Sequence, residues 1–338
     1  MDTLIRIGIA GYGNLGRGVE AAISRNHDMT LTGIFTRRDP ASVRPLAADA
    51  PVHRLAELDG FADRIDVLIV CGGSKSDLPE LGPQLAARFH TVDSFDTHAR
   101  IPWYFDAMDA AARPNGKIAI IAVGWDPGLF SLARLYGEAA LPGGSTWTFW
   151  GRGLSQGHSD AIRRVPGVRA AVQYTIPVAE AVERVRRGED PVLSTREKHT
   201  RECWVVLEDG ADAQAVEQAI RTMPDYFADY DTTVNFIDEA TLRRDHSQMP
   251  HGGFVIRTGE TGLDDPAVTH SAERNRHTME FSLTLGSNPE FTASVLVAHA
   301  RAAARLARRG ESGARTTFDI APGLLSPRSA AQLRAEWL

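Results

Sequence analysis

Short apolar runs alternate with helical patterns through the first third of the chain. Residues 5–10 are mostly apolar, and Leu15, Val19 and Ile23 then recur every four residues, as on a helix that buries one face. Further apolar runs at 31–35, 66–71, 89–92 and 118–123 predict strands. Strands that alternate with helices are typical of βαβ units, so this part of the chain is expected to form a parallel sheet.

The pattern changes beyond about residue 128. Longer strand-like stretches occur at 146–150, 168–176, 202–207 and 279–285, with helical segments between them, and predict an α+β second domain. A helical pattern at 292–309 suggests that the chain returns to the first domain. We therefore expect one domain over 1–124, completed by 289–338, and a second domain over 125–288.

Three predicted strands end in loops that carry glycine or polar residues, at 71–74, 93–96 and 124–128. In open α/β sheets ligands bind outside the carboxyl ends of the strands, so these loops are expected to converge on one crevice.

A glycine-rich motif lies between the first predicted strand and helix. Its spacing is G-x-G-x-x-G, and this context favours a Rossmann-type dinucleotide site over an ordinary glycine-rich turn. Gly11 permits the turn, Gly13 admits the pyrophosphate and Gly16 allows close packing of the helix. The motif and the 71–74 loop supply the expected cofactor contacts: Gly11, Tyr12, Gly13, Asn14, Leu15, Gly16, Cys71, Gly72, Gly73 and Ser74.

The end of the second strand indicates which dinucleotide binds. Proteins that select NAD place an acidic residue there, whereas this chain has Thr36, Arg37 and Arg38. Guanidinium groups bind phosphate bidentately, so NADP is the expected cofactor. The alternative is that both arginines are solvated surface charges.

Composition and charge limit the possible partners. With 338 residues the chain is long enough for two domains, and its net charge of −6 predicts no general attraction to nucleic acid or to an anionic membrane. Two cysteines, Cys71 and Cys203, are too few for a disulfide framework, and no apolar run approaches a membrane span. A cytoplasmic protein is expected. The arginines at 301, 305, 308 and 309 are interpreted as a solvated helix face.

A second short motif resembles the nucleophile elbow of hydrolases. Residues 153–157 read G-x-S-x-G around Ser155, and Asp160 and several histidines follow. A hydrolase triad remains an alternative, although the dinucleotide motif at the front of the chain disfavours it.

Several stretches taken together resemble the meso-diaminopimelate dehydrogenase family. They span almost the whole chain, and the Gly-Leu-Ser-Gln-Gly-His-Ser-Asp and Met-Pro-His-Gly-Gly sequences are specific to that family. The matching stretches are 11–17, 33–38, 124–128, 149–151, 153–161, 221–226, 234–240 and 249–253.

The resemblance implies an NADP-dependent enzyme that oxidises the D-centre of meso-2,6-diaminopimelate. It releases ammonia and L-2-amino-6-oxopimelate, runs reversibly, serves lysine and cell-wall precursor metabolism and acts as a homodimer without a metal. By resemblance Asp96 and Asp126 face the reacting ammonium, Trp125 and Trp150 wall the site, and Gln156 and Gly157 lie near the adjacent carboxylate. Four further residues match positions that hold the distal L-centre: Thr175, Arg201, His251 and Asn288.

The chemistry of the reaction requires a base, because hydride leaves Cα only when the amine has a free lone pair. An unperturbed aspartate has a pKa of about 3.9, so a base role for Asp96 or Asp126 requires burial or a neighbouring carboxylate. Between 262 and 286 the chain departs from the family pattern with a longer segment, 264–277, and Asn288 is the position most affected. A broader D-amino-acid dehydrogenase and a non-catalytic NADP sensor are the alternatives.

Overall fold

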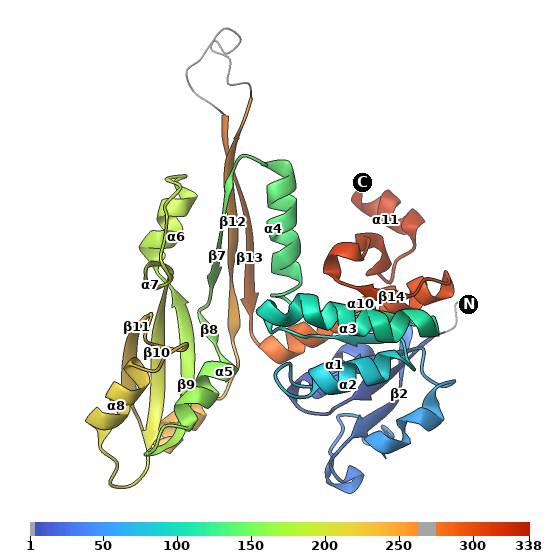
Figure 1. Ribbon diagram of the computed structural model, residues 1–338, viewed down its shortest axis with the longest axis horizontal. Coiled ribbons are helices and arrows are strands. Elements are labelled where there is room, and N and C mark those ends of the chain that lie inside the picture. The colour runs from blue at the N-terminus through green and yellow to red at the C-terminus, as the bar shows by residue number, and fades with distance from the viewer. Residues whose placement is uncertain (1–3, 263–274) are drawn as a thin grey trace. The chain divides into compact units, whose positions relative to one another are not determined.

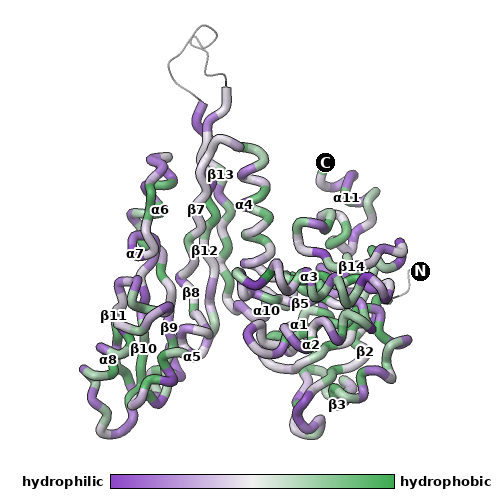
Figure 2. Tube along the Cα trace, viewed as in Figure 1, coloured by the Kyte–Doolittle hydropathy of each residue, from purple (hydrophilic) through white to green (hydrophobic). Residues whose placement is uncertain are grey.

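The chain divides into two compact units in the computed structural model, which describes residues 4–262 and 275–338 (Figure 1). Unit 1 comprises Met1–Leu132 and Pro289–Leu338, and unit 2 comprises Ala133–Asn288. Most of the 264–277 segment singled out above lies outside the described residues. Figure 2 shows hydrophobic residues along the strands and helices of both units and hydrophilic residues at several connecting turns.

Unit 1 is built on a seven-stranded sheet in the order β14-β6-β5-β4-β1-β2-β3. Every pairing in it is parallel, as the βαβ pattern predicted. The strands are β1 (Ile5–Ala10), β2 (Met29–Thr36), β3 (Val52–Arg54), β4 (Val67–Val70), β5 (Thr91–Asp93), β6 (Ile118–Ile120) and β14 (Gly313–Arg315).

Helices cover both faces of this sheet, because alternate strand residues are apolar on both sides. Ile7 and Ile9 of β1 pack in one core with residues of α1 (Asn14–Ser24) and α10 (Asn288–Arg308). Leu68 and Val70 of β4 pack in the other with α2 (Leu78–Ala86) and α3 (Ile101–Ala112). The C-terminal helix is α11, and short 3-10 helices complete the unit: α11 (Ala330–Trp337), η1 (Pro40–Ser42), η2 (Leu55–Phe61), η3 (His98–Arg100), η4 (Arg113–Asn115), η5 (Thr317–Asp319) and η6 (Pro322–Leu324).

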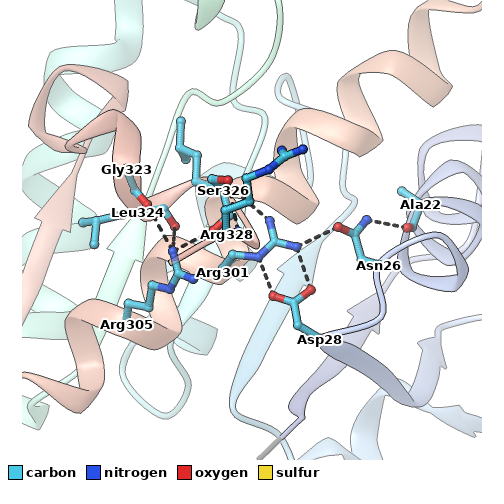
Figure 3. A network of polar contacts seen from close by, with 10 residues as sticks. Ala22, Asn26, Asp28, Arg301, Arg305, Gly323, Leu324, Ser326 and Arg328 are labelled. Atoms are coloured by element: carbon cyan, nitrogen blue, oxygen red, sulfur yellow. Dashed lines mark hydrogen bonds and ion pairs between the residues drawn. The ribbon is translucent and has the colours of Figure 1, made fainter. Parts of the chain in front are cut away.

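The expectation of a solvated arginine face on α10 is wrong for two of the four residues. Arg301 is 2% exposed and binds Asp28 through Nε at 2.6 Å (Figure 3). It also donates to the carbonyl of Leu325 at 2.7 Å. Arg305 donates to carbonyls of η6 and of the segment that follows it, including that of Ser326 at 2.8 Å. Only Arg308 and Arg309 are exposed. Arg301 of α10 therefore joins the C-terminal segment to the turn between α1 and β2 through buried charge.

Unit 2 contains two smaller sheets, as expected of an α+β domain. One has the order β11-β10-β9-β8 and the other the order β13-β12-β7. The β10–β11 pair is parallel and the other pairs between described strands of the unit are antiparallel. The strands are β7 (Ser145–Trp150), β8 (Gly153–Leu154), β9 (Val168–Pro177), β10 (His199–Leu207), β11 (Asp231–Phe236), β12 (His251–Thr261) and β13 (Asn275–Leu285).

Each sheet of unit 2 has its own small core. Cys203 and Val205 of β10 pack with α5 and α8, and Phe149 and Ile256 of the other sheet pack with α6. The helices are α4 (Leu129–Ala140), which crosses the boundary between the units, α5 (Gln156–Arg163), α6 (Ala179–Arg186), α7 (Thr195–Lys198), α8 (Ala213–Arg221) and α9 (Glu239–Asp245). Among the described residues no helix is both long and apolar enough to cross a membrane.

Candidate active-site residues

The glycine motif forms the turn from β1 to α1 that its spacing predicts. Gly11 has φ +94°, which favours glycine, and its N–H donates to the carbonyl of Phe35 at 2.8 Å. A Cβ on Gly16 would lie 2.3 Å from the Gly11 carbonyl, so the helix can pack this closely only with glycine. Gly13 precedes α1 and a Cβ there would meet no atom within 4 Å. The start of α1 is therefore open to a phosphate group.

A crevice of about 270 Å³ lies beside this turn in unit 1. Its lining includes Gly11–Gly13, Thr36–Arg38, Cys71 and Gly72, which are cofactor contacts expected from the sequence. Burial raises the pKa of the Cys71 thiol to about 12, so this wall is neutral. The glycine backbone and the two guanidinium groups that line this crevice fit the pyrophosphate and 2′-phosphate of NADP.

The two arginines of the crevice have different partners. Arg37 forms a 2.7 Å ion pair with Asp77, whose other oxygen accepts the N–H of Gly73 at 3.0 Å. These contacts hold the pKa of Asp77 below its usual range, the Gly73 bond most. Arg38 donates to the carbonyl of Tyr12. Both guanidinium groups are thus held at the crevice, and the Arg37 pair is exposed enough to exchange for a ligand phosphate.

The three predicted loops are linked in unit 1. Ser74, after β4, accepts the N–H of Asp96 at 3.0 Å, and Val123, after β6, donates to the carbonyl of Asp93 at 3.0 Å. Asp96 is exposed and Asp126 is half-buried. Trp125 is 8% exposed and meets Phe130 edge to face, with ring centroids 5.3 Å apart. The carboxyl ends of β4, β5 and β6 therefore bring Ser74, Asp96 and the Trp125–Asp126 loop to one edge of the sheet.

Sequence reasoning missed Asp93, which lies three residues before Asp96. Its side chain is fully buried and accepts the N–H of Phe95 and the hydroxyl of Tyr104, both at 2.9 Å. Burial raises the pKa of Asp93 to about 6, and it also raises the pKa of Tyr104. A buried carboxyl therefore fixes the loop that carries Asp96. The pattern gave no signal for it, because an aspartate after a strand usually faces solvent.

Two of the expected distal residues are direct neighbours in unit 2. Thr175 of β9 and Arg201 of β10 are register partners, both are buried, and Arg201 donates to the Thr175 hydroxyl. Gly153 of β8 pairs with Thr175 on its other side, and a Cβ on Gly153 would lie 2.4 Å from the His251 ring. Thr175, Arg201 and His251 thus gather around β8 and β9.

The remaining unit 2 residues lie on adjoining segments. Gln156, the first residue of α5, donates to the sulfur of Met249 at 3.1 Å, and the Met249 carbonyl accepts the N–H of Asn288 at 2.9 Å. Gly157 follows Gln156, and a Cβ there would meet no atom within 4 Å. Trp150 is the last residue of β7. The N–H of the next residue, Gly151, donates to the carbonyl of Gly252 at 2.8 Å.

No carboxylate in the part of the chain that the structure describes completes a hydrolase triad with Ser155 and His158. Ser155 caps α5 and lies 2.7 Å from Nδ1 of His158, but Asp160 pairs with Arg163 and not with His158. The His158 ring instead meets the rings of Tyr226 and Phe227, and burial lowers the pKa of His158 to about 4. Within residues 4–262 and 275–338 no cluster of three or more His, Cys, Asp or Glu could hold a metal ion.

Comparison with known proteins agrees with this geometry. A family model described as the diaminopimelic acid dehydrogenase C-terminal domain matches residues 124–287. The meso-diaminopimelate D-dehydrogenase of Lysinibacillus sphaericus is 63% identical over 334 residues, which cover 99% of each chain. The chain belongs to the meso-diaminopimelate D-dehydrogenase family.

Solved structures of similar chains agree with this membership. The Corynebacterium glutamicum diaminopimelate dehydrogenase in complex with diaminopimelate matches with a TM-score of 0.89 and 48% identity, over 99% of this chain and 100% of that one. An engineered D-amino acid dehydrogenase bound to NADP+ matches with a TM-score of 0.84 and 46% identity, over the same shares.

Proposed function

We propose that the protein catalyses the NADP-dependent, reversible oxidative deamination of the D-centre of meso-2,6-diaminopimelate, giving L-2-amino-6-oxopimelate and ammonia. One observation supports this assignment most directly. In a chain of this family, Arg201 is buried beside Thr175 and forms no ion pair with any described carboxylate. A buried cation without a counter-charge is suited to a ligand carboxylate.

We assign the reacting end of the substrate to unit 1 residues. Asp96 and Asp126 attract and orient the substrate ammonium, and one of them takes its proton, directly or through water, before the C–H bond breaks. Bound NADP+ supplies the hydride acceptor. Trp125 contributes an apolar wall that excludes water.

We assign the distal end to unit 2 residues. Arg201 and Thr175 bind the distal carboxylate. His251 and Asn288 contact the second ammonium and the atoms next to it. Gln156 and Gly157 bind the carboxylate next to the reacting carbon, and Trp150 forms a wall. A one-headed amino acid would leave the buried side chains of Arg201 and Thr175 without a ligand partner, at a cost of about 1–3 kcal/mol each, so the site favours a substrate with two amino-acid ends.

We assign cofactor binding to the unit 1 crevice. Gly11–Gly16 and the 71–74 loop would hold the pyrophosphate, and Thr36, Arg37 and Arg38 the 2′-phosphate. The corresponding domain assignment is dinucleotide binding by 1–124 with 289–338, and substrate binding and dimerisation by 125–288. A homodimer and a cytoplasmic location complete the proposal, and the two free cysteines, Cys71 and Cys203, suit a reducing compartment.

The assignment is tested by NADPH formation, measured by near-ultraviolet absorbance, with meso-diaminopimelate, its LL isomer and simple D-amino acids. We expect turnover of the meso isomer, none of the LL isomer, and a much smaller kcat/KM for D-alanine. Asp126→Ala should lose turnover by at least about a hundredfold while NADPH binding, followed by fluorescence, is retained. Near-equal kcat/KM values for D-alanine would instead favour a broad D-amino-acid dehydrogenase, and NADPH binding without turnover of any amino acid would favour a sensor.

A further inference from the structure

The guanidinium of Arg201 has too few polar partners for its burial. Arg201 is 6% exposed, its Nε is buried without a hydrogen-bond partner among the described residues, and its bond to Thr175 is to a neutral hydroxyl. Burial lowers the pKa of Arg201. Buried arginines are usually paired with a carboxylate, so something else must stabilise this charge before substrate binds.

The acidic residues next to Arg201 in the sheet are committed to other arginines. Glu202, the next residue on β10, pairs with Arg152. Asp231, at the start of the neighbouring strand β11, pairs with Arg196 at 2.6 Å. Neither carboxylate is therefore a counter-ion for Arg201.

Two histidines, His158 and His199, interact electrostatically with Arg201, and both are neutral at neutral pH. Burial, together with the positive charge of Arg201, lowers the pKa of His158 to about 4 and that of His199 to about 3. Neither ring therefore adds a second positive charge to that of Arg201 at neutral pH.

Tyr230 supplies the missing stabilisation. The guanidinium carbon of Arg201 lies over the Tyr230 ring, 3.8 Å from the centroid. A ring face attracts a cation through its quadrupole, and a hydrogen bond to Tyr230 opposes the lowering of the Arg201 pKa by burial. Tyr230 thus stabilises the charge without adding the negative charge that a carboxylate in the same place would add, and Nε still has no partner within the described part of the chain.

The backbone holds Tyr230 in this position. Its N–H donates to the carbonyl of Phe227 at 3.0 Å, and the following residue, Asp231, is the register partner of Thr200 on β10. Tyr230 therefore lies at the end of the turn that precedes β11, next to β10, the strand that carries Arg201.

We propose that Tyr230 is a positioning and specificity-determining residue, which stabilises the unpaired Arg201 cation so that the distal carboxylate of the substrate is its first counter-ion. This inference rests on the proposed role of Arg201 in binding that carboxylate. It assigns Tyr230 no contact with the reacting atoms.

Two variants separate the ring from the hydroxyl. Tyr230→Phe keeps the ring face and should leave KM for meso-diaminopimelate within about threefold, whereas Tyr230→Leu removes it and should raise KM by about tenfold. In both, kcat and KM for NADP+ should change by less than about threefold. Tyr136→Leu, at an exposed tyrosine of α4, is the matched control.

Equilibrium binding tests the specificity directly. Meso-diaminopimelate and D-lysine, which lacks only the distal carboxylate, are titrated calorimetrically into the enzyme saturated with NADPH, where no turnover occurs. Tyr230→Leu should weaken meso-diaminopimelate binding by about tenfold and leave D-lysine binding, even if weak, within about twofold. Equal losses for both ligands, or no loss for either, would overturn the proposal.

A second pair of variants, which differ from each other only in charge, tests the proposal even if Tyr230→Leu does not fold. Tyr230→Glu supplies the absent counter-ion and should bind meso-diaminopimelate at least about tenfold more weakly than Tyr230→Gln. Equal affinities of these two variants would also contradict the inference. If the wild-type enzyme does not oxidise meso-diaminopimelate at all, the proposed function fails rather than the role of Tyr230.

Discussion

His199 accepts the backbone N–H of Trp150 through Nε2 at 2.8 Å, and the two rings stack with centroids 5.4 Å apart. This contact joins the two sheets of unit 2, because His199 begins β10 and Trp150 ends β7. Burial lowers the pKa of His199 to about 3, so the ring stays neutral and its Nε2 remains an acceptor across the working pH range.

Replacing His199 should affect substrate binding, through Trp150, and leave cofactor binding unchanged. His199→Phe keeps a ring but leaves the Trp150 N–H unpaired, which costs about 1–3 kcal/mol. We expect lower stability in urea and a raised KM for meso-diaminopimelate, with KM for NADP+ unchanged. His199→Gln, which can still place an acceptor there, should recover part of both losses. An unchanged substrate KM in His199→Phe would show that Trp150 does not line the substrate site.

Arg37 and Arg38 should determine the choice of dinucleotide. Arg37→Ala with Arg38→Ala removes two charge-assisted contacts to the 2′-phosphate, so KM for NADP+ should rise by about a hundredfold while KM for NAD+ changes little. The matched control is Asp77→Asn, which removes the carboxylate that now pairs with Arg37 and should leave KM for NADP+ equal or lower. Steady-state kinetics with both cofactors measures this, and equal rises for NADP+ and NAD+ would contradict it.

Asp93 should make stability fall as pH rises. Its folded-state pKa of about 6 exceeds the unfolded value of about 3.9, so the folded protein retains a proton that the unfolded chain has lost. The resulting contribution of Asp93 to the free energy of unfolding is complete below about pH 4 and is lost as the pH rises through 6. The change amounts to about 3 kcal/mol.

Asp93→Asn should remove this dependence. Its Tm relative to the wild type should therefore rise between pH 4 and pH 7, as measured by thermal unfolding at each pH. Asp109→Asn should show the opposite sign, because the Arg113 side chain lowers the pKa of Asp109. A Tm difference for Asp93→Asn that is constant with pH would mean that Asp93 titrates normally.

Arg301 should be a main determinant of unit 1 stability. Arg301→Met removes the pair with Asp28 and the bond to Asn26 (Figure 3). It also removes the bond to Leu325, and should cost about 3 kcal/mol. Arg308→Met, at an exposed position on the same helix, should cost less than about 0.5 kcal/mol. Urea unfolding followed by circular dichroism compares the two. Equal small losses of stability in the two variants would mean that the Arg301–Asp28 pair makes no net contribution to the free energy of unfolding.

Local pattern was enough to predict the sheet and the cofactor loop. The alternation of apolar runs and helical repeats located β1, β2, β4, β5 and β6, because each buries residues that are close in the chain. The short strands β3 and β14 were not predicted, since three residues carry no periodicity. The long strand β12 was missed as well, because glycines interrupt its apolar pattern.

What the sequence determined by itself was the parallel sheet, the dinucleotide motif and, through resemblance, the family. Which charges are buried, and which groups face them, follows only from the folded chain. Arg301 and Arg201 are both arginines in regular elements, yet one is held by Asp28 and the other by the ring of Tyr230. The physical reason is that the energy of a charge depends on neighbours brought from distant parts of the chain, and no local pattern encodes those neighbours.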